Sequence, residues 1–262
     1  MLNEQKHVNK DNYTEYLLCL ALDIGEGMLK AGAEISRVED TIERICRAYG
    51  AIHVEVFSII SFVNAAIRMP DGSYSSQLRR VRSTNNNLDR LEKLNSLSRE
   101  ICATTPDLDT FDAKIHEIKK NASYPVWVKV AASAFAVGSF SIFFGGKAID
   151  ALVASFIGVL ISVVDNYSSS KINSMAKTVV SAFVASMIAG LSVLLNLGTN
   201  SDTVIIGAIM ILVPGIAFGT ALRDLLYGDL LAGSLKTLNA FLGALMIAFG
   251  YMLAASIMGG AI

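Results

Sequence analysis

The chain has 262 residues, a formal net charge of -1 and 53% hydrophobic residues. Residues 1–125 hold 16 of the 22 Lys and Arg and 18 of the 23 Asp and Glu, although they are less than half of the chain. This uneven charge excludes one uniformly water-soluble domain. It predicts a soluble domain over 1–125 and a lipid-embedded domain over 126–262.

The N-terminal part is expected to begin with two helices. Residues 1–12 are polar and lack the apolar segment of a signal peptide, which predicts that the following domain stays in the cytosol. From 13 to 31, apolar residues recur at helical spacing, as expected for a helix with one buried stripe. Ser36 and Glu39 have the spacing of a capping box, so a second helix is expected to begin at Ser36 and to end near Tyr49.

Strand-forming residues follow these two helices. The stretch 53–68 is rich in Val, Ile and Phe, and Asp71-Gly72 predicts a hairpin turn that leads into 73–81. Helical sequence returns at 87–104 and 108–122. The first part is therefore predicted to be a compact α+β domain.

The second part contains five apolar segments. A helix that crosses a bilayer needs about 20 mostly apolar residues. The segment 149–164 is short, so it either spans at a tilt, the favoured interpretation, or is partly re-entrant. The expected spans are 126–144, 149–164, 178–197, 203–222 and 238–258. The predicted fold class is an α-helical membrane protein with five transmembrane helices, preceded by a soluble α+β cytosolic domain.

Basic residues predict the orientation of these spans. If the N-terminal domain is cytosolic, Lys and Arg gather at the cytosolic span ends and only Lys147 flanks an outer end, in agreement with the positive-inside rule. Lys129 lies inside an apolar run but near its cytosolic start, so it is expected to snorkel to the interface. An odd number of spans places the C-terminus, Ile262, outside.

Two motifs carry a family resemblance. The first is GEGMLKAGAEISRVE over residues 25–39, and the second, over 212–233, contains LVPGIA and ALRDLLYGD. In this order, with spans behind a soluble domain, they resemble the threonine/serine exporter (ThrE-like) family over nearly the whole chain. The resemblance implies a bacterial inner-membrane exporter of small carboxylates.

The resemblance also implies a partner. Full-length members are similar to this chain followed by a second membrane-embedded half. This chain is therefore more similar to the YjjP-like larger subunit of a split two-component exporter, which works with a small YjjB-like membrane subunit and is associated with dicarboxylate (succinate) export. The substrate stays open between threonine/serine-type amino acids and succinate-type dicarboxylates, and a homo-oligomer also stays open.

Pro214 is the sharpest candidate in the substrate pathway. It removes a backbone donor and clashes with the carbonyl of Met210, so the fourth span should kink or break. A half-helix that begins at Gly215 would offer N–H groups and a positive dipole end to a carboxylate, whereas the alternative is a packing kink. Gly219, four residues further on, gives the small-residue spacing of closely packed helices.

Charged residues near the span ends are further candidates. Arg223, Asp224 and Asp229 lie near the cytosolic interface, where they select or release an anionic substrate or simply anchor the helix ends. No acidic residue or His falls in the middle of a span. Proton coupling is therefore expected at Asp150 and Asp165, or in the partner subunit.

The first motif contributes Glu26, Gly32, Glu34, Arg37 and Glu39. Its carboxylates suggest acid–base chemistry, but no nucleophile with a nearby His and no metal-ligand spacing accompany them. We therefore expect capping and docking here, with no catalysis, no metal and no cofactor. The alternative function is a membrane-anchored regulatory or hydrolase-like cytosolic domain.

The basic run Arg79-Arg80-Val81-Arg82 is interpreted as a solvated strand or a contact with the anionic lipid bilayer, not as a nucleic-acid site.

Overall fold

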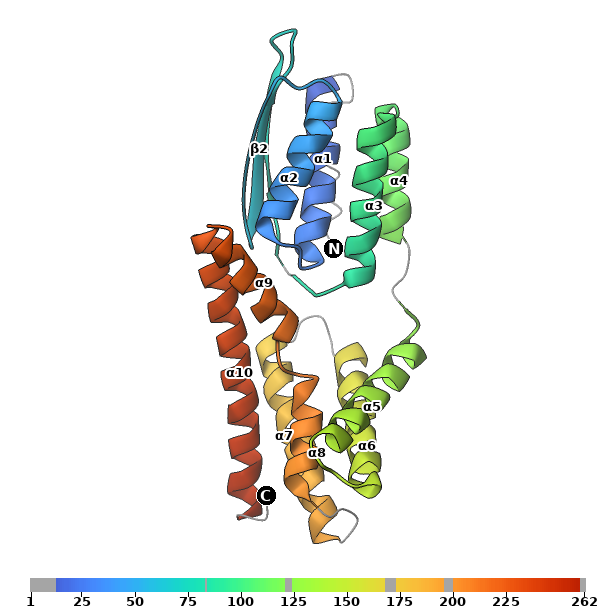
Figure 1. The fold of residues 1–262 in the computed structure, drawn as a ribbon, viewed down its shortest axis with the longest axis vertical. Coiled ribbons are helices and arrows are strands. Elements are labelled where there is room, and N and C mark those ends of the chain that lie inside the picture. The colour runs from blue at the N-terminus through green and yellow to red at the C-terminus, as the bar shows by residue number, and fades with distance from the viewer. Residues whose placement is uncertain (1–12, 83, 121–123, 168–172, 196–199, 260–262) are drawn as a thin grey trace. The chain divides into compact units, whose positions relative to one another are not determined.

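The computed structural model describes residues 13–82, 84–120, 124–167, 173–195 and 200–259. Within these residues the chain is mostly helical, with one three-stranded sheet near the N-terminus (Figure 1). Its contacts divide it into two units: an N-terminal unit of residues 1–123 and 216–237, and an apolar unit of residues 124–215 and 238–262. The segment 216–237, which the sequence placed with the spans, packs with the N-terminal residues.

The N-terminal unit is built in three layers (Figure 1). The sheet forms one layer, α1 and α2 cover one of its faces, and α3 and α4 pack against these helices. The elements are α1 (Tyr13–Lys30), α2 (Ile35–Ala48), β1 (His53–Ile59), β2 (Phe62–Arg68), β3 (Tyr74–Arg80), α3 (Leu88–Thr104), α4 (Leu108–Lys120), most of α9 (Gly215–Leu226) and the start of α10 (Leu230–Met258).

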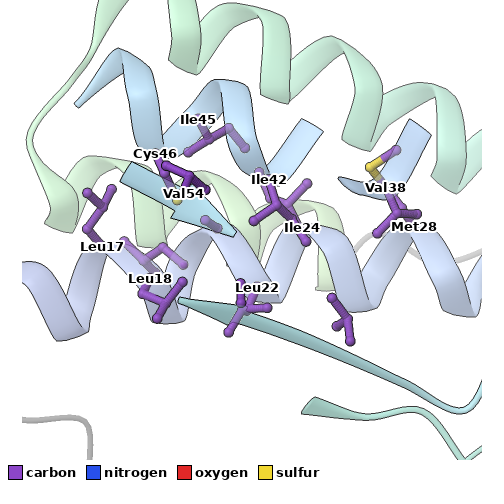
Figure 2. Close-up of a cluster of buried hydrophobic side chains, with 14 of the residues drawn as sticks. Leu17, Leu18, Leu22, Ile24, Met28, Val38, Ile42, Ile45, Cys46 and Val54 are labelled. Carbon is purple, nitrogen blue, oxygen red and sulfur yellow. The ribbon is translucent and has the colours of Figure 1, made fainter. Parts of the chain in front are cut away.

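Helix α1 is the centre of this unit. Thirteen of its 18 residues are buried, so the expected single stripe is wrong: the helix is covered on several sides, by the sheet, α2, α3 and α4. Figure 2 shows the α2 side chains Val38 and Ile42 directed toward α1, near Met28 and Ile24. Gly25 permits this approach, because a Cβ at that position would lie 2.4 Å from Cδ1 of Ile42.

The start of α2 differs from the sequence prediction. The N-cap residue is Glu34, it makes no side-chain capping hydrogen bond, and the helix begins at Ile35. The predicted capping box is wrong, because the carboxylate of Glu39 accepts the N–H of Ser58 in β1, at 2.6 Å, instead of turning back to Ser36.

The sheet is antiparallel with the order β1-β2-β3. The predicted turn at Asp71-Gly72 is confirmed: Gly72 has a φ of 86°, a conformation that favours glycine, and the N–H of Ser73 donates to Asp71. The stretch 53–68 contains a second turn, at Ile60-Ser61, that the sequence did not reveal.

The apolar unit consists of helices that pack through small residues. They are α5 (Val126–Phe143), α6 (Ala148–Tyr167), α7 (Ser174–Leu194), α8 (Ser201–Met210) and the remainder of α10. In α7, Ser181, Ala185 and Ala189 follow at intervals of four residues and are all buried in this packing. Gly207 of α8 is equally close to α5, because a Cβ there would lie 2.9 Å from the N atom of Ser141.

Four described helices are long and apolar enough to cross a membrane: α5, α6, α7 and α10. The pair α8 and α9 makes a fifth if it is counted as one span that bends at its break. Helix α6 has 20 residues and is longer than the expected segment 149–164. The expected span 203–222 is interrupted between Met210 and Gly215, where α8 ends and α9 begins. Helix α10 begins at Leu230, eight residues before the expected span, and Leu197, the expected end of the third span, lies outside the described residues.

Candidate functional site

A polar cavity of about 330 Å³ lies in the apolar unit, between α5, α6, α7 and the break after α8. Three charged side chains line it: Lys129 of α5, Asp165 of α6 and Lys177 of α7. Its other polar lining residues are Ser133, Ser162, Asn166, Ser174, Thr178 and Ser181. The cavity therefore collects most of its polar groups from three helices that are otherwise apolar.

Helical spacing brings these groups to one side of each helix. Lys129 and Ser133 are four residues apart on α5, and Ser174, Lys177 and Ser181 follow at intervals of three and four on α7. Residues at such intervals share a helix face. This polar stripe was the sequence signal for the cavity, and it was missed because Lys129 was interpreted alone, as a snorkelling residue.

Helices α5 and α6 approach closely beside the cavity. The hydroxyl of Ser133 donates to the carbonyl of Gly158 at 2.8 Å. A Cβ at Gly158 would lie 2.7 Å from the carbonyl oxygen of Ser133, so the contact requires glycine. This packing fixes the position of Ser133 relative to Ser162, one turn further along α6.

The charges of the cavity are not paired with one another. Among the described residues, none of Lys129, Asp165 and Lys177 has an ion-pair partner within 4.0 Å. Lys129 and Lys177 lie in the first turns of their helices and are partly buried, whereas Asp165 lies in the last turn of α6 and is exposed. Charged residues within membrane-embedded helices are candidates for functional positions. Two ammonium groups, one carboxylate and a set of hydroxyls match a small ligand that carries a carboxylate together with an amine or a second carboxylate.

The expected break at Pro214 is confirmed and lies beside the cavity. Helix α8 ends at Met210, and α9 begins at Gly215. Ile211 and Leu212, within the break, line the cavity, whereas Pro214 does not.

The backbone N–H groups that were expected to be free at this break are not all free. The N–H of Gly215 donates to the carbonyl of Val213 at 2.8 Å, so it is already used. No described atom lies within 4 Å of a Cβ built at Gly215 or Gly219, so the small-residue spacing of α9 is not used for packing within the described chain.

A second cluster lies in the N-terminal unit, where α9 and α10 meet the start of α2. Asp224 is fully buried; its carboxylate accepts the N–H of Ile35 at 3.2 Å and the ammonium of Lys236 at 2.5 Å. Lys236 also donates to the carbonyl of Ala33, and Arg223 forms an ion pair with Glu34. Asp224 thus takes the place of the predicted capping box, because it caps α2 and faces the positive end of its dipole.

The two sequence motifs therefore meet in space, and other acidic residues surround their junction. Burial raises the pKa of Glu39; the N–H of Ser58 opposes this rise, and Asp229 adds to it. Burial also raises the pKa of Asp229, with a further rise from Asp224 and an opposing effect of Lys236. Asp229 thus disfavours ionisation of Glu39, and Asp224 disfavours ionisation of Asp229.

The remaining residues singled out in the sequence are dispersed. Asp150 is buried in the first turn of α6, where it accepts the N–H of Lys147, about 22 Å along the helix from Asp165. In the first motif, Glu26 pairs with Lys30 and Gly32 has a φ of 88° after α1. Arg37 lies in a separate groove. No group of three or more His, Cys, Asp or Glu side chains in the described ranges could hold a metal ion.

A comparison of the sequence with models of protein families gives a match that covers most of the chain. Residues 19–258 match the ThrE family model, which is described as "Putative threonine/serine exporter". No curated protein and no solved structure gives a match. Because the family model covers both motifs, the cavity-lining helices and every candidate span, the chain belongs to the threonine/serine exporter (ThrE) family and is a multi-pass membrane transport protein.

Proposed function

We propose that the chain is a subunit of a secondary exporter that moves small carboxylates out of the cell, and that the cavity between α5, α6 and α7 binds the substrate. The cavity itself carries this proposal: it combines hydroxyl groups with Lys129, Lys177 and Asp165, which have no ion-pair partner in the described part of the chain, in a member of an exporter family. A substrate carboxylate would neutralise the two ammonium groups, which are otherwise costly to hold in an apolar unit.

The two substrate classes would use the cavity differently. A threonine/serine-type amino acid would place its carboxylate at Lys129 and Lys177, its ammonium group at Asp165 and its hydroxyl among the serines. A succinate-type dicarboxylate would use one lysine for each carboxylate and would leave Asp165 as the candidate group for proton coupling. Substitution of Asp165 therefore separates the two classes.

The orientation we propose has five spans, with residues 1–123 in the cytosol and Ile262, outside the described residues, on the outer side of a bacterial inner membrane. The spans are α5, α6, α7, the pair of α8 and α9, and α10. The contacts of Arg223 and Lys236 support this order, because they hold the end of α9 and the start of α10 in the N-terminal unit. The basic residues at the cytosolic span ends support it as well.

We further propose that a second small membrane subunit, or a second copy of this chain, covers α9 and α10. The glycines of α9 have no packing partner among the described residues, although their spacing is the one that helices use to approach closely. Large apolar side chains are exposed beside them, including Phe218 and Leu222 of α9 and Phe241 of α10.

A transport measurement tests the substrate site. The chain is reconstituted in vesicles, with and without a small co-expressed membrane partner, and efflux of threonine and of succinate is measured. Lys129→Gln and Lys177→Gln should each lower efflux roughly 10- to 100-fold, the loss expected for one charged hydrogen bond. Lys147→Gln, at the other end of α5, is the matched control and should leave efflux unchanged.

The substitution Asp165→Asn distinguishes the substrates, since it should abolish threonine efflux but leave facilitated succinate movement without its pH dependence. Full efflux by both lysine variants would remove the cavity from the pathway. Efflux no greater than from empty vesicles under every condition would favour the alternative, a membrane-anchored regulatory domain.

Labelling of single introduced cysteines tests the orientation. Lys147→Cys lies between α5 and α6, and Tyr227→Cys lies between α9 and α10, both at exposed positions. A membrane-impermeant maleimide applied to intact cells should label the first variant and spare the second, compared with the parent chain. The reverse pattern contradicts the proposed orientation.

A further inference from the structure

The N-terminal unit contains a groove of about 540 Å³ between α2 and α3 that the exporter function does not use. Three arginines line it: Arg37 and Arg44 come from α2, and Arg99 comes from α3. Only one acidic residue, Asp40, is among its lining residues. The groove thus carries a net charge of about +2 over its lining, in a chain whose overall charge is close to zero.

Most of this positive charge is not neutralised by the protein. Arg44 is held by Asp40 at 2.7 Å, one turn earlier on the same helix. Arg37 and Arg99 have no acidic partner among the residues that the structure describes, and Arg99 donates only to the hydroxyl of Ser96 at 3.1 Å. Two guanidinium groups therefore keep donors that are free for an oxyanion.

The floor of the groove supplies neutral polar groups. Thr41 of α2 and Ser98 of α3 are buried there, and Asn95 lies one turn before Ser98. Cys102 and Ala103 of α3 complete the lining of the groove. Burial raises the pKa of the Cys102 thiol and Arg44 opposes that rise, so the guanidinium of α2 lies close to the wall that α3 provides.

We propose that this groove binds a small organic phosphate with at least two negative charges. Arginine presents a planar fork of donors that matches phosphoryl oxygens, and two forks on facing helices hold such a group from both sides. The volume lies within the range of roughly 300–1,000 Å³ that small-molecule sites occupy, so the groove accommodates more than a bare inorganic ion. Bound hydroxyl groups would meet Thr41, Asn95 and Ser98.

A ligand bound in this groove would also affect the contact between α2 and α9. Arg37 and Arg44 belong to α2, the helix whose N-terminus is held by Asp224 of α9. A ligand that joins α2 to α3 would stabilise the helix that α9 docks against. This site does not depend on the cavity between α5, α6 and α7, and its test does not require transport.

Calorimetry on the full chain in a neutral detergent tests the site with inorganic pyrophosphate as the probe. The parent chain should bind one pyrophosphate, and should bind it more tightly than succinate. The double variant Arg37→Gln/Arg99→Gln should bind at least about tenfold more weakly, because it loses the charged hydrogen bonds of two guanidinium groups. Arg47→Gln is the matched control: Arg47 is exposed on α2 and paired with Glu43, but it does not line the groove.

Three results overturn the proposal: no saturable binding by the parent chain, equal affinity in the double variant, or affinity for succinate equal to or above that for pyrophosphate. Loss of binding in Arg47→Gln also overturns it, because the attraction would then be general surface charge. A second arm repeats the titration in phosphatidylcholine vesicles with or without phosphatidylglycerol. Competition by phosphatidylglycerol, whose phosphodiester headgroup carries one negative charge, would contradict a site for a phosphate with at least two charges. No competition is the result expected for a free organic phosphate.

Discussion

The substitution Asp224→Ala removes the carboxylate that joins α9 and α10 to the start of α2. In the parent chain Asp224 accepts the N–H of Ile35 and the ammonium of Lys236, whose side chain is only 14% exposed. After the substitution Lys236 keeps the carbonyl of Ala33 but loses its counter-charge. Breaking a buried ion pair from one side costs about 3–5 kcal/mol, and loss of a helix N-cap costs about 1 kcal/mol.

We therefore expect Asp224→Ala to destabilise the N-terminal unit by roughly 4–6 kcal/mol. In a unit of this size each kcal/mol lowers Tm by roughly 2–4 °C, so the expected fall in Tm is roughly 8–24 °C. The double variant Asp224→Ala/Lys236→Met should be more stable than Asp224→Ala alone, because methionine fills the space of the lysine stem without an unpaired charge.

The assay is thermal unfolding of the purified full chain in detergent, followed by tryptic cleavage within the N-terminal unit. Arg44→Ala is the control, since it breaks an exposed ion pair with Asp40 and should change stability by less than about 1 kcal/mol. Equal Tm values for Asp224→Ala and the parent would refute the reasoning. A double variant less stable than Asp224→Ala would also contradict it, because the buried lysine would then not be the source of the cost.

Three further predictions concern single residues. Because its folded pKa is raised, Glu39 contributes stability that is present below its ordinary pKa and is lost as pH rises through the raised value. The Tm of Glu39→Gln should therefore rise relative to that of the parent as the pH increases above about 4.5. A constant difference in Tm would contradict the effect of burial and Asp229. Gly158→Ala should reduce folded yield because its Cβ meets a carbonyl oxygen of α5 at 2.7 Å, whereas Gly243→Ala, with its nearest contact at 3.7 Å, should be tolerated; equal yields would contradict the close packing. Pro214→Ala should join α8 to α9, reshape the cavity and lower export per inserted complex without loss of Tm, and full export would remove the break from the mechanism.

Local sequence patterns predicted most elements of the N-terminal unit. Helix α3 follows the expected stretch 87–104, except that Asn87 lies before the helix as its N-cap and accepts the N–H of Arg90. Asp71 and Gly72 form the expected turn. These features depend on residues two to four positions apart, and interactions of such short range are visible in the order of residues.

Predictions failed where a distant residue competes for a local group. Ser36 and Glu39 have capping-box spacing, but Glu39 is taken by Ser58 of β1. The N-terminus of α2 is capped by Asp224 instead, 189 positions along the chain from Ile35. The residue pattern of α2 does not reveal this cap, because tertiary packing brings Asp224 to Ile35.

The sequence by itself determined the helices, the division of charge between a polar and an apolar part, and the family motifs. Tertiary structure decided which of their residues act together: it gathered Lys129, Asp165 and Lys177 from three helices into one cavity, and it brought Glu34 to Arg223. The physical reason is that helix formation follows from neighbours within one turn, whereas a binding site needs groups from separate helices. The approach of those helices depends on close contacts such as the one that Gly158 permits.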